Sequence, residues 1–205
     1  MPRATYRGLP FTKYADKIKN PQQDDARGGR IQSREDVVDH LWTNILVYYF
    51  QNPRPMTFSV ERESYLLNNR RQKTDIAVVN LVGPDADMQK VLNFEAKCPL
   101  GPPNNRKPTD DERGEVRAQL RNNMGLARRA DQSTQDIYGV VAIGTWARLY
   151  KLPGGETFLV PIRRCNGEFE FNVWKHHIAI QREMTRWARE IAEGASSTTS
   201  AQQQA

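Results

Sequence analysis

The stretch that decides the fold is Lys73–Pro99, with the sequence KTDIAVVNLVGPDADMQKVLNFEAKCP. It predicts two strands, Lys73–Val82 and Val91–Lys97, because each contains a run of β-branched or large apolar residues. The connection between them contains glycine, proline and aspartate, which are typical of turns. The stretch therefore predicts two neighbouring strands of a sheet.

Three charged side chains fall on these two strands. Side chains alternate across a strand, so Glu95 and Lys97 share one face of the second strand. If the strands pair, Asp75 on the first comes beside Glu95. Carboxylate oxygens are ligands that Mg²⁺ prefers, and a bound Mg²⁺ can activate water and neutralise charge on a phosphate. Lys97 would lie within reach of the same phosphate.

Thr74-Asp75 followed by Glu95-Ala96-Lys97 resembles the motif of the PD-(D/E)XK nuclease superfamily. Thr74 stands where the name of the motif has proline. The resemblance implies an α/β fold with a restriction-endonuclease-like core, in which helices flank a mixed central sheet in the order α-β-β-β-α-β. It also implies a metal-dependent nuclease that uses a Mg-activated water, with Asp75, Glu95 and the Ala96 carbonyl as ligands of Mg²⁺ or Mn²⁺ and Lys97 as a catalytic group.

The rest of the chain fits this order. Hydrophobic periodicity, capping residues and turn signals predict a sequence of helices and strands around the motif. They are a helix from Ser33 to about Gln51, a strand at Thr57–Leu67, a helix from Thr109 to about Ala130, two strands within Ile137–Leu152, a hairpin formed by Phe158–Ile162 and Glu168–Val173, and a helix from Trp174 to about Glu193 that Gly194 ends. The segment Ile137–Leu152 is similar to the corresponding part of many superfamily members, especially fungal ones.

We therefore expect a single domain at residues 33–194, which an irregular arm precedes at 1–32 and a disordered tail follows at 195–205. Two residues on the predicted helices also resemble superfamily site residues. Gln119 corresponds to a glutamine on the helix after the E-x-K strand, near the scissile phosphate. Glu35 corresponds to an extra metal-binding acid on the helix before the sheet, and a solvated glutamate in a first helical turn is its alternative.

Composition favours a nucleic-acid partner. The net charge is +6, and no apolar run is long enough to span a membrane. The chain has only two cysteines and its start lacks the apolar core of a signal peptide, so we expect an intracellular protein of the nucleus or cytoplasm. DNA is favoured over RNA, and a homodimer is compatible with this function. The candidate phosphate contacts are Arg70, Arg71, Lys73, Arg106, Lys107, Arg117 and Arg121.

Two other interpretations stay open. A nuclease-like fold could serve as a nucleic-acid-binding, effector or toxin module without turnover. Alternatively, the match could be coincidental, since an E-x-K pair on a strand is often a solvated ion pair. A coincidental match predicts that Asp75 and Glu95 lie on opposite faces or more than ~8 Å apart, too far for one Mg²⁺ with ligands at ~2.1 Å to bridge.

Overall fold

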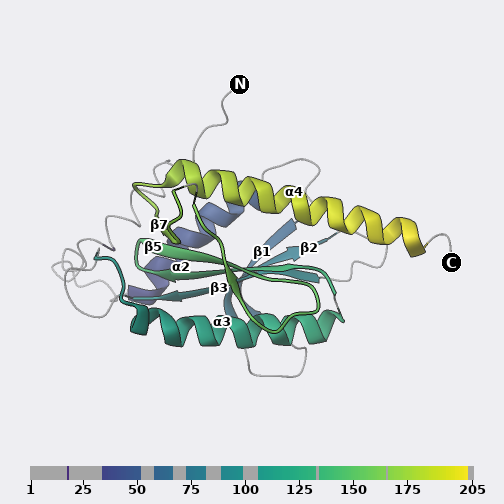
Figure 1. The fold of residues 1–205 in the computed structure, drawn as a ribbon, viewed down its shortest axis with the longest axis horizontal. Helices are drawn as coiled ribbons and strands as arrows, with labels where there is room; N and C mark the ends of the chain where they lie inside the picture. The colour runs from purple at the N-terminus through teal and green to yellow at the C-terminus, as the bar shows by residue number, and fades with distance from the viewer. Residues whose placement is uncertain are drawn as a thin grey trace, which may run out of the picture.

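The computed structural model describes residues 18, 34–51, 58–66, 73–81, 89–98, 106–132, 134–164 and 166–202, with the side chains of 34, 35, 51 and 194–202 left out. In these residues one seven-stranded mixed sheet lies between helices (Figure 1). The elements are helix α2 (Arg34–Leu46), a π-helical segment (Val47–Gln51), strands β1 (Phe58–Tyr65), β2 (Lys73–Asn80) and β3 (Gln89–Lys97), helix α3 (Asp110–Asp131), strands β4 (Ile137–Ile143), β5 (Trp146–Leu152), β6 (Val160–Pro161) and β7 (Glu170–Asn172), and helix α4 (His177–Gln202).

The sheet combines an antiparallel meander with one parallel pair. Strands β1, β2 and β3 pair antiparallel in sequence order, which confirms the predicted three-strand meander. Strand β4 then pairs parallel to β3, and α3 forms the crossover that a parallel pair requires. Strands β4 and β5 form an antiparallel hairpin through a turn at Gly144, whose φ is 60°. The strand that carries the E-x-K motif is therefore central in the sheet.

The two faces of the sheet build two separate cores. On one face, Leu92, Phe94 and Ala96 of β3 pack in the large apolar cluster that includes residues of α2 and α4. On the other face, α3 packs through Val116, Leu120 and Met124 on residues of β4 and β5. Figure 1 shows α3 along one side of the sheet and α4 along the other. Residues of β3 that alternate with Phe94, Glu95 among them, consequently lie under α3.

Helix α3 begins where the sequence predicts. Thr109 and Glu112 form the predicted capping box, in which the Glu112 N–H donates to the Thr109 hydroxyl at 3.3 Å. The Thr109 N–H donates in return to the Glu112 carboxylate at 2.8 Å. These two bonds satisfy amides that have no partner within the helix and fix its first residue.

The predicted hairpin near the C-terminus is wrong in its pairing. Its turn forms, since the Arg164 N–H donates to the Glu168 carbonyl at 2.6 Å and Gly167 has a φ of 83°. The strands that flank the turn, however, do not pair with each other: β6 and β7 each pair with a different part of β5. Pro161 has no N–H to donate, so β6 pairs over only two residues.

The last helix differs from the prediction at its C-terminal end. Helix α4 runs on to Gln202 instead of ending at Gly194. A glycine within a helix costs only about 1 kcal/mol relative to alanine, and it ends a helix only where the chain turns left-handed. Residues 203–205 of the predicted tail, and most of the predicted arm at 1–32, lie outside the described residues. No helix in the described part of the chain is long and apolar enough to cross a membrane.

The close approach of α3 to β4 gives a first prediction. A Cβ at Gly139 would lie 2.6 Å from the Met124 sulfur and 3.0 Å from a Leu120 methyl group. We therefore expect Gly139→Val to lower the free energy of unfolding by roughly 2 kcal/mol through overpacking. Urea denaturation measures this, with Gly114→Ala as the control because nothing lies within 4 Å of a Cβ there. The control should be stabilised by roughly 0.5–1 kcal/mol, and a Gly139→Val protein as stable as the wild type would contradict the packing described here.

Candidate functional site

The carboxylate of Glu95 is completely buried and is held by three neutral donors. Its exposed fraction is 0%. Oε1 accepts hydrogen bonds from the Thr74 hydroxyl at 2.9 Å and from the Asn123 amide at 2.6 Å. Oε2 accepts one from the Gln119 amide at 2.7 Å. No ion pair reaches Glu95 from any residue that the structure describes.

Helix α3 supplies two of these donors because their positions are four residues apart and because the helix lies close to the sheet. Gln119 and Asn123 are four residues apart, so both amides lie on the flank of α3 that faces β3. Leu120 and Met124 pack over Gly139, which has no side chain to hold the helix away. This close approach allows two short amide side chains to reach Glu95.

Asp75 lies where β2 leaves the ladder with β3. The last pair of that ladder on this side is Ile76 with Phe94. One residue further on, Oδ2 of Asp75 accepts a hydrogen bond from the Ala96 N–H at 2.7 Å. Lys97 is the final residue of β3 and is half-buried. The structure thus gathers Asp75, Glu95 and Lys97 at one end of β2 and β3.

Burial and the neighbouring charges act on Glu95 in opposite directions. Burial and, after it, the negative charge of Asp75 raise the pKa of Glu95, while the hydrogen bonds from Asn123 and Thr74 and the charge of Lys97 lower it. The net result is a pKa of about 8, against an ordinary value of 4.5. The site therefore holds a carboxylate whose charge is poorly compensated.

The Thr74 hydroxyl suits both protonation states of Glu95. Its oxygen lies 2.9 Å from Oε1 of Glu95, 3.0 Å from the Phe94 carbonyl and 3.4 Å from the Ile76 carbonyl. A hydroxyl has one hydrogen to donate and can also accept. When Glu95 is ionised, the hydroxyl can donate a hydrogen bond to it. When Glu95 is protonated, the hydroxyl can donate to the Phe94 carbonyl and accept a hydrogen bond from the Glu95 carboxyl group.

The other two predicted metal ligands are only partly described. Ala96 lies between Glu95 and Lys97, and its N–H binds Asp75. That its carbonyl is a ligand stays a prediction. Glu35 lies in the first turn of α2, and its side chain is outside the described residues.

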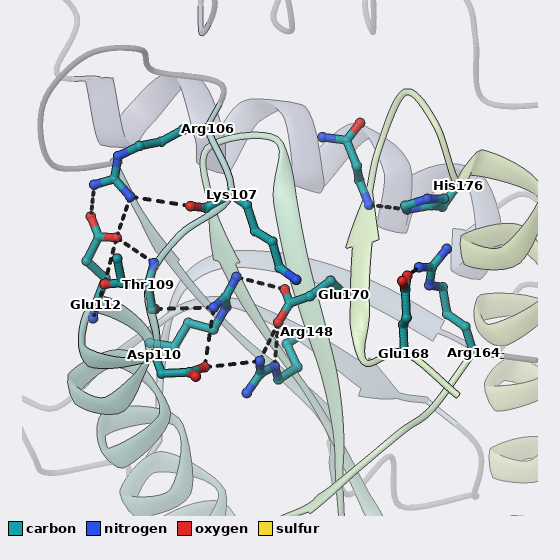
Figure 2. A network of polar contacts seen from close by, with 12 residues as sticks. Arg106, Lys107, Thr109, Asp110, Glu112, Arg148, Arg164, Glu168, Glu170 and His176 are labelled. Atoms are coloured by element: carbon teal, nitrogen blue, oxygen red, sulfur yellow. Dashed lines mark hydrogen bonds and ion pairs between the residues drawn. The ribbon is translucent and has the colours of Figure 1, made fainter. Parts of the chain in front are cut away.

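Most of the predicted phosphate contacts do not gather at this site. Arg70 and Arg71 lie outside the described residues. The Lys73 ammonium lies 3.2 Å from a Glu63 carboxylate oxygen. Arg106 donates to both oxygens of Glu112 at 2.8 and 2.6 Å, and so supports the start of α3 (Figure 2). Arg106 therefore has a structural partner, while Lys107 is exposed beside it.

Arg117 and Arg121 lie on the other flank of α3. Positions 117 and 119 are separated by about 160° around a helix of 3.6 residues per turn. The flank of Arg117 and Arg121 also carries Arg128, which donates to the Leu152 carbonyl of β5 at 2.8 Å. Both arginines are exposed, but they face away from Glu95.

A second polar cluster under α3 was not predicted. Glu95, Val141 of β4, Arg148 of β5 and Glu170 of β7 follow one another in register across the sheet. Glu170 is 4% exposed and binds two cations, Arg113 at 2.9 Å and Arg148, whose Nε also lies 2.9 Å away. Asp110 lies against both arginines in the same network (Figure 2). Two acids and two bases compensate each other, so we assign this cluster a structural role.

Sequence reasoning missed Thr74 and Asn123 as parts of the site. Asn123 could have been found, because it follows Gln119 at the helical spacing of four residues. Thr74 had a signal too, as the neighbour of Asp75. Glu170 had none, since its arginine partners lie on distant elements.

Comparison with known proteins identified no relative of this chain. No family model matches the chain, and no curated protein and no solved structure is significantly similar to it. The inference about function therefore depends on the site itself.

The pKa of Glu95 predicts a loss of stability as the pH rises. Between pH 4.5 and about 8 the folded protein keeps a proton on Glu95 that the unfolded chain has released, so the free energy of unfolding falls across this range. Glu95→Gln removes this dependence. In metal-free buffer, we expect the stability of the wild type relative to the variant to fall by roughly 4 kcal/mol between pH 5 and pH 8.5.

Urea denaturation at both pH values measures this difference. The control is Glu115→Gln, which changes an exposed carboxylate of α3. A parallel pH dependence in the wild type and Glu95→Gln would contradict the raised pKa.

The second cluster gives a separate stability prediction. Glu170→Ala leaves Arg113, which is 5% exposed, without its buried partner. We expect a loss of roughly 3–5 kcal/mol in the free energy of unfolding. Glu193→Ala is the matched control, because its carboxylate is 71% exposed and lies 3.9 Å from Arg189, which is itself 69% exposed. The control should cost less than about 1 kcal/mol, and equal losses in the two variants would refute the assigned role.

Proposed function

We propose that this chain is a metal-dependent nuclease with the restriction-endonuclease-like core of the PD-(D/E)XK superfamily, and that it hydrolyses phosphodiester bonds of nucleic acid, with DNA favoured. The observation that carries the proposal is the grouping of Asp75, Glu95 and Lys97. Asp75 binds the backbone N–H of the residue after Glu95, and the charges of Asp75 and Lys97 both act on Glu95.

The order of the elements supports the same proposal. Helix α2, the meander β1–β3, helix α3 and a strand parallel to β3 follow in the order that the resemblance implies. Gln119 of α3 donates a hydrogen bond to Glu95, which brings the helix after the E-x-K strand to the motif. The coincidental match predicted carboxylates far apart, and the bond between Asp75 and Ala96 argues against it.

The residues of the site fit a divalent cation. Glu95 is buried among neutral donors with a second carboxylate beside it, and the charge of Lys97 does not outweigh burial and Asp75, since the pKa of Glu95 stays raised. Carboxylate oxygens are the donor type that Mg²⁺ and Mn²⁺ take. Asp75 and Glu95 would hold the ion. When bound, it would lower the pKa of a water and neutralise charge on the phosphate.

The remaining residues would act on the substrate directly or through Glu95. Lys97 is a half-buried cation at the end of β3. Its ammonium would attract the scissile phosphate and aid removal of a proton from the attacking water. Gln119 and Asn123 keep the Glu95 carboxylate in place between β3 and α3.

Cleavage assays test the proposal. Single- and double-stranded DNA and RNA are incubated with the protein in Mg²⁺, in Mn²⁺ and in EDTA. We expect cleavage that requires the metal and that falls by about 100-fold or more in Lys97→Ala, Glu95→Gln and Asp75→Asn. The control is Glu193→Ala, whose exposed carboxylate lies on α4, which covers the face of the sheet opposite to α3.

Each other outcome has a distinct meaning. Cleavage that persists in all three variants would come from another site or a contaminant, and would contradict the proposal. Binding of nucleic acid without cleavage in either metal would favour the non-catalytic module instead.

A further inference from the structure

The two oxygens of Glu95 differ in how fully they are occupied. A carboxylate oxygen offers about two acceptor positions. In the ionised carboxylate, which is the form that binds a cation, Oε1 accepts from both Thr74 and Asn123, so both of its positions are taken. Oε2 accepts from Gln119 alone and keeps one position. Only Oε2 can accept a further bond without displacing a donor.

The donors of the two oxygens also differ in burial. Thr74 is 0% exposed and Asn123 1% exposed, so packing fixes both side chains. Gln119 is an exposed residue at the outer side of the site. The two donors of Oε1 are therefore buried, whereas the donor of Oε2 belongs to an exposed residue.

From this asymmetry we propose that Thr74 and Asn123 are positioning residues that bind Oε1 of Glu95 and thereby present Oε2 to a divalent cation as a single-oxygen ligand. This inference depends on the proposed nuclease function. It adds two residues that the motif does not include, and one of them, Thr74, stands where the motif has a proline that could not donate a hydrogen bond.

Loss of either donor would act on the metal through Glu95. Without Asn123 or Thr74, the carboxylate can rotate about its last torsion and turn Oε1 toward the cation position. Hydrogen-bonding partners of metal ligands are commonly worth ~10–100-fold in metal affinity. Gln119 binds the oxygen that the cation would share, from the exposed side, so its loss should matter less.

Calorimetric titration of Mn²⁺ into the nucleic-acid-free protein measures this role without any turnover. We expect Asn123→Leu to weaken Mn²⁺ binding by about 10-fold or more and Thr74→Val by about 5-fold or more. Thr74→Ser keeps the hydroxyl and is expected to bind within about 2-fold of the wild type. Gln119→Leu is expected to change the affinity by less than about 3-fold.

The outcomes separate this inference from the function on which it depends. If the wild type binds no Mn²⁺, the metal-dependent function fails and this inference fails with it. If the wild type binds Mn²⁺ and Thr74→Val binds equally well, only the positioning role is refuted. The comparison of Thr74→Val with Thr74→Ser decides this even if Asn123→Leu does not fold, which circular dichroism and thermal melting would show.

Discussion

The burial of the Glu95 carboxylate between β3 and α3 is the constraint on which the rest of the described structure depends. A buried charge is costly unless it is hydrogen-bonded and compensated. The chain meets half of this requirement by itself, with one hydroxyl and two amides around the carboxylate. Among the described residues no ion pair with Glu95 forms, and the charge of Asp75 raises its pKa more than that of Lys97 lowers it. An arrangement that only served stability would place an arginine here, as the same sheet does at Glu170.

Helix α3 is fixed along its whole length, which keeps its two amides in register with Glu95. At its start, Arg106 and the capping box hold the first turn. Further along, Arg113 binds Glu170 of β7. At its end, Arg128 donates to the carbonyls of Leu152 and Gln135. A helix held at both ends cannot slide along the sheet, so Gln119 and Asn123 stay opposite Glu95. The arginine-rich composition of the chain is thus used in part to hold α3 in place.

Much of the architecture was predictable because its signals are local. Apolar periodicity and the Thr109 capping box gave helices α2 and α3 and the meander strands to within a few residues. Asp75, Glu95 and Gln119 could be named because a short motif fixes their spacing. Net charge does not show which face would meet a polyanionic partner, so it could not predict that Arg106 binds Glu112 or that Arg117 lies on the flank of α3 away from Glu95.

What failed depends on tertiary pairing. The two short segments near the C-terminus contain a clear turn between them, yet β5 offers an edge to each. No local pattern distinguishes pairing of the two segments with each other from pairing of each with β5, because each segment forms a short strand in either arrangement. Likewise, α4 continues through Gly194, because a glycine alone does not end a helix.

The parallel pairing of β3 with β4 has a consequence for how the protein folds. The donors to Glu95 come from positions 74, 119 and 123. Strand β4 can pair with β3 only after the chain has crossed over through α3. Closing such a long loop costs chain entropy before the strand pairing contributes favourable free energy, so non-local pairs form late. A growing chain that ends before β4 already contains every residue of the motif. In such a chain α3 cannot yet pack on β4, so its two amides are not held at Glu95. The site therefore forms only when β3, α3 and β4 fold together.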